Sequence, residues 1–553
     1  MSKEIKYGNE AQEAVVKGIN TVADIVKTTI GPKGRNVLIR ENGGTPIITN
    51  DGVTIAKSIQ LKDNTEDAGA SLIISAAQKT NDIAGDGTTT TTLLASEMIK
   101  NGFKFLKENP SLNPVQLQKE MLLVADMVSD DLLKNAQEVK DDEALKRVAS
   151  ISSGSEITGE LIASAFKQAG EYGSVIVEDS KTGITGLSTV MGMKLPNGSV
   201  SPYLLERSTL VSEVDDVSVM IIKDKIDNVP DLIPVLDACN REGRRLLIIC
   251  DDIDFEPLNF VVMNKARGAI NVNIIRLPGF NNDLRNAMTD DLSIATGATV
   301  ISREAGKTLK AFTSEWFGEL ASVRVELEET VLKFKDINSY GVDLLADRME
   351  RAKELNLQKE TLGVGKDTTH YEKRISNLIG GISVIEVGGN SEIEIKDTKL
   401  RIEDALNSVK AAIEEGIVAG GGYSFIQAVE DIQENVDSTM VAATGPFERA
   451  IALDTMILSL QSVIQQIAEN AGLNGKEVLE KCSKDKVGFN ALTGEYVDLI
   501  SAGIINAVKV DRYCVLNAAS VAGTVLTMGG AIIEENEKDQ NLLQLINPSV
   551  PVI

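Results

Sequence analysis

The chain has 553 residues, which at about 150 residues per domain predicts roughly three to four domains. Apolar residues make up 43% of the sequence and charged residues 25%, a composition that excludes wholesale disorder. The formal net charge of −25 disfavours general binding to nucleic acid or anionic membranes, because both carry negative charge. The lone histidine, His370, argues against a serine–histidine–aspartate triad and excludes a multi-histidine metal site.

The cysteines and one uncharged segment bear on where the chain works. The four cysteines, at positions 239, 250, 482 and 514, form no CxxC pair, so zinc-ribbon and thioredoxin-type sites lack support. Few cysteines, and an N-terminus without the apolar core of a secretory signal, predict a cytoplasmic protein. The segment Tyr513–Ile533 is long enough to cross a bilayer, but its small and polar residues favour a buried core helix.

The first hundred residues are expected to be mostly helical, with one hairpin. Helices are predicted over residues 10–30, 68–79 and 88–105 from the spacing of their apolar residues. The first helix is expected to end before Gly31-Pro32, since both residues break helices. Extended chain is predicted at 36–40, 46–49 and 53–56, with a turn at Asn50–Gly52.

The middle of the chain has a different pattern. Helices and strands alternate there, over residues 230–242, 246–250, 257–267 and 272–277. Such alternation is typical of an α/β domain. From about Glu403 the chain returns to long helices rich in small residues, so we expect the α/β domain to be carried between two halves of a helical one.

Three glycine-containing segments are suited to binding a phosphate, although no Walker motif or GxGxxG fingerprint occurs. They are Thr29–Pro32, Asp86–Thr90 and Gly420–Gly422. In the second, a carboxylate precedes a row of threonines at a helix start, a pattern that suits Mg²⁺ and phosphate oxygens. Each segment alone is weak evidence, since a threonine row is more often a helix cap or an exposed loop and a triple glycine is more often a turn. Likewise, Asp51 suits a turn, and Asp404 suits a solvated helix face.

Several segments together resemble the group I chaperonins of the GroEL type, in the order and spacing of that family and over nearly the whole chain. They are Thr29–Asn36 (TIGPKGRN), Asn50–Val53 (NDGV), Asn81–Thr90 (NDIAGDGTTT), Val387–Gly388, Arg401–Leu406 (RIEDAL) and Glu414–Gly422 (EEGIVAGGG). The AGDGTTT and VAGGG strings are highly specific. The resemblance implies a multidomain α+β fold with a mainly helical equatorial domain that holds ATP, a small intermediate domain and an α/β apical domain.

The domain boundaries that follow from the resemblance leave two domains discontinuous. We expect the equatorial domain at 1–133 and 416–553, the intermediate hinge domain at 134–191 and 380–415, and the apical domain at 192–379. The resemblance also implies a homo-oligomeric ring, heptameric and either single or double, that encloses non-native polypeptides. A co-chaperonin lid is a further partner that the family suggests, whereas nucleic acid and membranes are not expected as partners.

The resemblance assigns roles to individual residues of an ATP site. The residues expected to line the nucleotide are Thr29, Ile30, Gly31, Pro32, Gly87, Thr88, Thr89, Thr90, Gly421, Asn490, Ala491 and Asn506. Asp86 would hold Mg²⁺, Asp404 would orient or activate the attacking water, and Asp51 would assist near the γ-phosphate. Phosphoryl transfer depends on positioning and neutralised charge, so aspartates, Mg²⁺ and water suffice for it.

A second set of residues matches the apical surface that binds unfolded chains in this family. The set is Tyr203, Leu204, Ile233, Leu236, Leu258, Val262, Met263 and Asn264. Ile233 and Leu236 lie three residues apart, so we expect them to share one helix face. In a monomeric enzyme these apolar residues would be core, whereas exposed apolar patches bind non-native chains with little sequence preference.

The sequence also departs from the family pattern. Asn50 stands where a lysine is usual, Asn506 where an aspartate is usual, and Ser199 replaces an aromatic residue. The C-terminal segment Asn541–Ile553 lacks Gly-Gly-Met repeats. ATP hydrolysis remains the expectation because Asp51, Asp86 and Asp404 are present, but dependence on K⁺, nucleotide affinity and reliance on a lid stay open.

Three functions are therefore carried forward. The leading one is an ATP-driven protein-folding chaperonin that binds non-native polypeptides, encloses them and releases them. The second is a ring-forming holdase or scaffold that does not couple ATP turnover to release, suggested by Asn50 and Asn506. The third, a small-molecule α/β enzyme, depends only on the strand–helix alternation in the middle of the chain.

Overall fold

The computed structural model describes residues 3–40, 46–139, 142–169, 174–180, 182–207, 209–279, 282–361, 369–438 and 447–534, so the segment Asn541–Ile553 lies outside it. The chain forms two compact units. The first comprises Met1–Ala163, Lys181–Ile184 and Val387–Ile553, and the second comprises Ser164–Ser180 and Thr185–Glu386. The first unit therefore combines segments from both ends of the chain, while the three expected domains and their boundaries stay a prediction.

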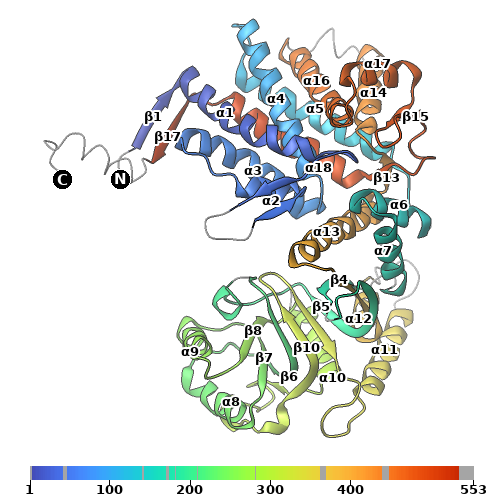
Figure 1. Ribbon diagram of the computed structural model, residues 1–553. Coiled ribbons are helices and arrows are strands. Elements are labelled where there is room, and N and C mark those ends of the chain that lie inside the picture. Colours follow the sequence, from blue (N-terminus) through green and yellow to red (C-terminus); the bar gives the residue numbers. More distant parts are fainter. Residues whose placement is uncertain are drawn as a thin grey trace, which may run out of the picture. The chain divides into compact units, whose positions relative to one another are not determined.

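The first unit is a bundle of long helices (Figure 1). Its main helices are α1 (Gly8–Val26), α3 (Asn64–Ala84), α4 (Thr88–Glu108), α5 (Pro114–Lys134), α16 (Phe447–Asn470) and α18 (Val508–Leu526). Helix α18 packs against α3, α4 and α5. Small residues such as Ala518, Ala519 and Ala522 are fully buried along α18, which lets neighbouring backbones approach closely.

Two apolar helices of this unit belong to its core. The helix predicted at Tyr513–Ile533 is buried as expected, but it ends at Leu526 and is followed by strand β17 (Gly530–Glu534). Among the described residues one helix, α16, has the length and mean hydropathy of a membrane span, and half of its most apolar window is buried. Because α16 packs against α4, α5 and α17 (Gly475–Asp485), it is a core helix of the bundle.

Four small antiparallel sheets complete the described part of the first unit. They pair β1 (Lys3–Tyr7) with β17, β2 (Val37–Ile39) with β3 (Ile47–Thr49), β13 (Ile417–Ala419) with β16 (Ile505–Ala507), and β14 (Gly488–Asn490) with β15 (Glu495–Val497). The predicted hairpin at 36–49 is confirmed. The first sheet joins the two ends of the described chain, as Figure 1 shows.

The extended chain predicted at Val53–Ala56 is wrong, because this segment is helix α2 (Gly52–Ser58). Asp51 is its N-cap, and its side chain accepts hydrogen bonds from the backbone N–H groups of Val53 and Thr54. A capping aspartate satisfies donors that a helix start leaves unpaired. The β-branched residues favoured a strand locally, and the cap together with burial of Ile55 overrode that preference.

The described part of the first unit also contains helices α6 (Asp142–Ser153), α13 (Glu392–Glu415), α14 (Tyr423–Ser438) and the start of α7 (Glu156–Ala169). Helices α6 and α13 pack against each other, and α13 also contacts α18 and α3. The RIEDAL segment lies within α13, so Asp404 is carried on a helix as expected.

The second unit is built around a mixed sheet with the strand order β4-β12-β5-β11-β10-β6-β7-β8, and β9 also pairs with β6. The strands are β4 (Ser174–Asp179), β5 (Gly186–Leu195), β6 (Ser212–Ile222), β7 (Arg245–Cys250), β8 (Val272–Arg276), β9 (Val300–Ile301), β10 (Gly318–Val325), β11 (Thr330–Phe334) and β12 (Gly381–Val387). Strands β6, β7, β8 and β9 are parallel, as the predicted strand–helix alternation requires.

Helices cover both faces of this sheet (Figure 1). They are α8 (Val229–Glu242), α9 (Phe255–Ala266), α10 (Asn282–Thr296), α11 (Leu344–Thr361) and α12 (Thr369–Ile379). Alternate residues of β6 enter different cores: Val219 and Ile221 lie in the one that includes α10, and Met220 and Ile222 in the one under α8 and α9. Burial on both faces explains the continuous apolar runs of the parallel strands.

Candidate functional site

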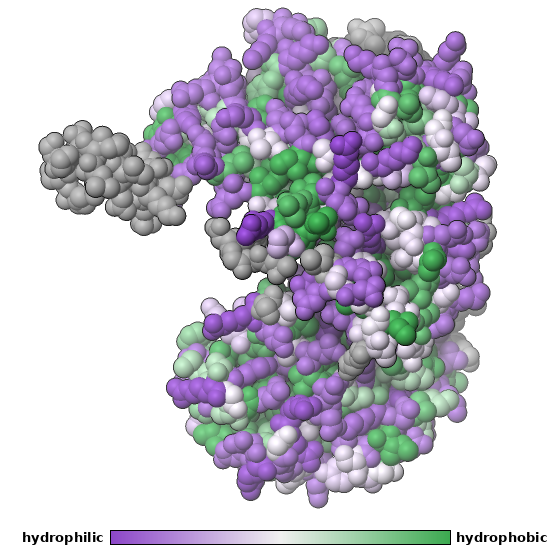
Figure 2. Space-filling model, in the orientation of Figure 1, coloured by the Kyte–Doolittle hydropathy of each residue, from purple (hydrophilic) through white to green (hydrophobic). Residues whose placement is uncertain are grey.

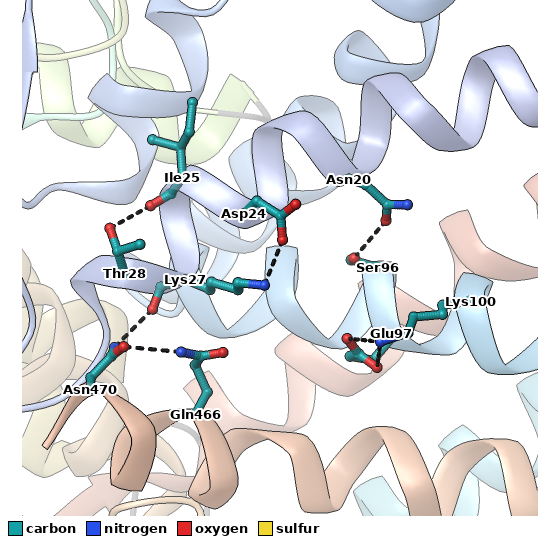
Figure 3. Close-up of polar contacts among 10 residues, drawn as sticks. All are labelled: Asn20, Asp24, Ile25, Lys27, Thr28, Ser96, Glu97, Lys100, Gln466 and Asn470. Atoms are coloured by element: carbon teal, nitrogen blue, oxygen red, sulfur yellow. Dashed lines mark hydrogen bonds and ion pairs between the residues drawn. The ribbon is translucent and has the colours of Figure 1, made fainter. Parts of the chain in front are cut away.

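The Thr29–Pro32 loop after α1 is the first of the three segments expected to bind a phosphate. Gly31 has a φ of +84°, and a Cβ at this position would lie 3.1 Å from Ile467 of α16. The Asn470 amide, also on α16, donates hydrogen bonds of 2.9 Å to the carbonyls of Lys27 and Ile30. Figure 3 shows Asn470 reaching Lys27 from α16, with Gln466 donating to the Asn470 side chain at 3.0 Å. The loop is therefore held by a helix distant in sequence.

The N-terminus of α4 is arranged as an anion site. Gly85 and Gly87 both have left-handed backbone, with φ of +74° and +88°. A Cβ on Gly87 would come within 2.5 Å of the Cys514 sulfur, so a side chain is sterically excluded there. Gly87 is the N-cap of α4 and provides no side-chain cap. The first N–H groups of α4 are thus left for an anionic ligand, which the helix dipole also favours.

The threonine row divides into two groups. Thr91 and Thr92 are buried and hydrogen-bond within the bundle, to Thr80 Oγ at 3.0 Å and to the Thr88 carbonyl at 2.8 Å. Thr89 lies instead next to Thr29, with 3.5 Å between their hydroxyl oxygens. A Cβ on Gly52 would come within 2.6 Å of the Thr89 hydroxyl. The Thr29 loop, the start of α2 and the start of α4 therefore converge on one point.

Three aspartates share this region of the first unit. Asp86 accepts hydrogen bonds from the Gly87 N–H and from the hydroxyls of Ser152 and Ser408. The Asp51 side chain caps helix α2, a role that neither the turn nor the nucleotide interpretation of this residue predicted. Burial raises the pKa of Asp404 well above its usual value, and the negative charges of Asp86 and Asp51 add to this effect. Ser408, one helical turn after Asp404 on α13, donates a hydrogen bond to Asp86 at 2.7 Å, so α13 brings Asp404 to the Asp86 region.

This arrangement fits a divalent cation that arrives with its phosphate ligand. Among the residues described, no group of three or more His, Cys, Asp or Glu side chains forms a ready-made metal cage. Mg²⁺ is commonly held by one or two carboxylates together with substrate phosphates, and Asp86 lies directly before the open helix start. Because three neighbouring carboxylates repel one another, a cation here would also relieve that repulsion.

The triple glycine lies between strand β13 and helix α14. The Gly420 N–H donates to the Ile504 carbonyl at 2.9 Å, and Gly421 and Gly422 both have positive φ. A Cβ on Gly422 would come within 2.9 Å of Val463, whereas Gly421 has only ordinary contacts, to Phe489 and Leu499. Gly421 therefore leaves room for a ligand against its backbone, as its expected role requires.

Three more residues expected to line the nucleotide, Asn490, Ala491 and Asn506, lie on the β14–β15 hairpin and on strand β16. The Asn490 side chain accepts hydrogen bonds from the N–H groups of Leu492 and Thr493, which stabilises the turn after β14. Ala491 is buried. The Asn506 amide donates to Asp511 at 3.0 Å, and its Oδ1 lies 3.1 Å from where a Cβ on Gly420 would be. Asn506 thus faces the triple glycine with its acceptor oxygen.

The second unit carries an exposed apolar surface on η2 (Pro202–Leu204), α8 and α9. Of the expected residues, Tyr203 is 75% exposed, Met263 46% and Ile233 42%. Leu258 and Val262 are half-buried and pack against the core below. Asn264 donates to the Phe260 carbonyl of its own helix at 2.7 Å. Figure 2 shows apolar and polar residues intermixed over this edge of the unit.

Two of the expected surface residues are not exposed. Leu204 is fully buried and Leu236 is 5% exposed, so the expectation that Leu236 shares an exposed face with Ile233 is wrong. Three-residue spacing turns a helix by about 300°, which is enough to move one residue toward the sheet. In their place the structure exposes Phe255 (81%) and Phe260 (36%) on α9. Their exposure was not predicted from the sequence, although Phe260 lies within the helix predicted at 257–267 and Phe255 lies just before it.

Several polar residues of the candidate ATP site were missed altogether. They are Ser152, Ser408, Asn470 and Asp511. Each is remote in sequence from the residue it contacts or lacks a recognisable motif, so no local pattern distinguishes it. Ser408 alone had a signal, because it follows Asp404 by four residues and so lies on the same helix face.

Comparison with known proteins identifies the family. The model of the TCP-1/cpn60 chaperonin family matches residues 22–536. Among solved structures, the chaperonin gp146 from the bacteriophage EL 2 (Pseudomonas aeruginosa), crystallised in the presence of ATP-BeFx, is similar in two crystal forms. The form II structure matches with a TM-score of 0.71 and 21% identity over 96% of this chain and 99% of that chain. Form I matches with a TM-score of 0.64 and 20% identity over the same shares. The chain therefore belongs to the TCP-1/cpn60 chaperonin family, as a divergent member of the GroEL type.

Proposed function

We propose that this chain is an ATP-driven protein-folding chaperonin that binds non-native polypeptides, encloses them in a homo-oligomeric ring and releases them as ATP is hydrolysed. The observation that carries the proposal is the convergence at the start of α4 of Asp86, of α13 with Asp404, and of the start of α2 that Asp51 caps. Family membership supports a chaperonin function. All four cysteines are buried and free, which fits work in the reducing cytoplasm.

In the proposed reaction the first unit binds ATP and positions water. The start of α4 and the loops at Thr29–Pro32 and Gly420–Gly422 would hold the nucleotide, with backbone N–H groups on its phosphates. Mg²⁺, held by Asp86, would neutralise phosphate charge. Asp404 would orient the attacking water or accept its proton, a task that its raised pKa favours. Asp51 holds the start of α2 and contributes charge beside Asp404.

The proposed client surface lies on the second unit. Tyr203, Ile233, Phe255, Phe260 and Met263 expose apolar side chains there. Exposed apolar groups bind unfolded chains with little sequence preference, because the hydrophobic effect is non-directional. Met263 adds a flexible contact that adapts to different clients.

The catalytic assignment is tested by replacing Asp404. We expect Asp404→Ala to abolish most steady-state ATP turnover while nucleotide binding, measured by calorimetry, persists. Asp397→Ala is the matched control, since Asp397 is a half-buried acid of the same helix that pairs with Arg401 at 2.9 Å. Undiminished hydrolysis by the Asp404 variant, with turnover equal to that of the control, would contradict the assignment.

Coupling of turnover to release distinguishes the proposal from a holdase ring. A chemically denatured client is captured in the absence of nucleotide, and refolded client is then measured with and without ATP and Mg²⁺. The proposal expects ATP-dependent recovery of the client in the wild type and none in Asp404→Ala. Capture without ATP-dependent recovery in the wild type would instead favour the holdase.

A further inference from the structure

Two serine hydroxyls converge on the carboxylate that is expected to hold the cation. Ser408 Oγ donates to Asp86 Oδ2 at 2.7 Å, and Ser152 Oγ donates to the same oxygen at 3.1 Å. The two hydroxyl oxygens lie 3.2 Å apart, so they form one cluster with the carboxylate. Ser408 is buried, which shields its hydrogen bond from competing water.

The two serines come from helices that pack on each other. Ser152 lies near the end of α6, and Ser408 lies in the middle of α13. Ser408 follows Asp404 by four residues, so both face the same direction from α13. The approach of α13 is close: a Cβ on Gly85 would lie 2.1 Å from the Cβ of Asn407. Any residue other than glycine at this position would push α13 away.

The number of hydrogen bonds that the Asp86 carboxylate can accept indicates the role of the two serine hydroxyls. An ionised carboxylate has about four lone-pair sites on its two oxygens. The hydroxyls of Ser152 and Ser408 occupy both sites of Oδ2, and the Gly87 N–H donates to Oδ1 at 2.6 Å. Three sites are therefore taken by this chain, which fixes the carboxylate orientation and leaves acceptor capacity on Oδ1.

We propose that Ser408, assisted by Ser152, is a positioning residue that ties α13 to the phosphate-binding loop through Asp86. Its hydroxyl orients the Asp86 carboxylate and, through the same helix, keeps Asp404 at the site. The role depends on the proposed ATPase function for its effect on turnover, whereas the hydrogen bonds of the tie involve only residues of this chain.

The test compares Ser408→Ala, Ser152→Ala and Ser408→Thr with the wild type. Ser462→Ala is the control, because the Ser462 hydroxyl bonds only to the Ser459 carbonyl of its own helix among the contacts found in the described chain. Without nucleotide, we expect amide exchange in residues 85–88 and 400–412 to rise about tenfold in Ser408→Ala. With Mg²⁺ and ATP, we expect kcat to fall about tenfold while the Kd for ADP changes less than about twofold.

The conservative variant separates positioning from folding. Ser408→Thr keeps the donor and is expected to restore slow exchange and kcat, whereas Ser152→Ala gives a smaller change in the same direction. Exchange and kcat in both alanine variants equal to those of the Ser462 control would overturn the proposal. If the wild type proves not to hydrolyse ATP, the proposed function fails, while exchange in the nucleotide-free protein still decides whether the tie exists.

Discussion

A second hydrogen-bond network, centred on Asp511, lies at the candidate ATP site beside the triple glycine. Asp511, in the first turns of α18, is buried and accepts hydrogen bonds from Ser424 at 2.7 Å and from Asn506 at 3.0 Å. It therefore links α18, β16 and α14 at the border of the site. Burial raises the pKa of Asp511 from 3.8 to about 6, although both hydrogen bonds oppose the shift.

This raised pKa predicts a specific dependence of stability on pH. Between pH 3.8 and about 6 the folded state binds more protons at Asp511 than the unfolded state, so stability falls as pH rises through this window. The full effect is on the order of 3 kcal/mol. The Asp511→Asn variant cannot ionise at this position. We therefore expect the difference between its urea midpoint and that of the wild type to increase in favour of the variant as pH rises from 4 to 6.5. Parallel midpoints for the two proteins across this range would refute the assignment.

At the scale of single residues, motifs in the sequence identified the three aspartates and the glycines but not their partners. Asp86, Asp51 and Asp404 lie within recognisable strings, and the structure brings them into one electrostatic cluster. The roles of Ser408, Asn470 and Asp511 can be inferred only from their hydrogen bonds to other segments of the bundle. The exposure of single apolar residues could not be predicted from the sequence either. Leu204 and Leu236 are buried, whereas Tyr203 and Ile233 close to them in the chain are exposed.

At the scale of elements, α9 presents more aromatic surface than was expected from the sequence. Phe255 and Phe260 are exposed on this helix, beside Met263. Phe255 is 81% exposed, and Phe260 presents part of its ring to solvent on the same helix. We therefore expect both to be apolar anchors of the proposed client surface.

Replacing both phenylalanines should weaken capture of clients without unfolding the unit. We expect Phe255→Ser with Phe260→Ser to lower capture of a denatured protein about tenfold or more, because burying one Phe stabilises by about 1.5–3 kcal/mol. Capture is measured as suppressed aggregation in the absence of ATP. Leu357→Ser is the control, since Leu357 is 64% exposed on α11, at the other edge of the same unit in Figure 1. Equal losses in both proteins would argue against a specific surface.

Helix α2 shows where local preference and tertiary context disagree. The β-branched residues Val53, Thr54 and Ile55 favoured extended chain, but the Asp51 cap and the burial of Ile55 made the segment helical. The helices and strands predicted in the middle of the chain, α8, β7, α9 and β8, agree with the structure. Glycine stops and continuous apolar runs marked them, whereas a four-residue segment rich in β-branched residues carries no such mark.

At the scale of the whole molecule, two small sheets of the first unit bear on self-association. In the part of the chain that the structure describes, the β1–β17 pair and the β2–β3 hairpin each have two strands and no further partner strand. Two-stranded sheets are marginally stable alone, and their free edges favour pairing with other strands. Leu38 and Ile48 on the hairpin are 64% and 49% exposed, and Figure 2 shows apolar residues near this hairpin.

We expect substitutions on the hairpin to disrupt the proposed ring. Leu38→Asp with Ile48→Asp should lower the mass measured by light scattering toward that of one chain, since charge is costly in a buried apolar contact. The helical signal in circular dichroism should stay unchanged. Leu492→Asp, at a position that is also 64% exposed, provides the comparison. An oligomer that survives the hairpin substitutions would show that other surfaces hold the copies together.

The sequence by itself determined the family, the discontinuous α+β architecture and the aspartates of the proposed reaction, because these depend on periodicity and on strings specific to the chaperonins. The α/β middle alone fitted a small-molecule enzyme equally well, and the family match decided against that interpretation. Only the tertiary structure decided which apolar residues face solvent, that the segment after Asp51 is helical, and that Ser152 and Ser408 meet at Asp86. The physical reason is that exposure and converging hydrogen bonds depend on segments far apart in the chain, as Ser408 and Asp86 are, 322 residues apart. The helix after Asp51 depends on a local cap together with the burial of Ile55.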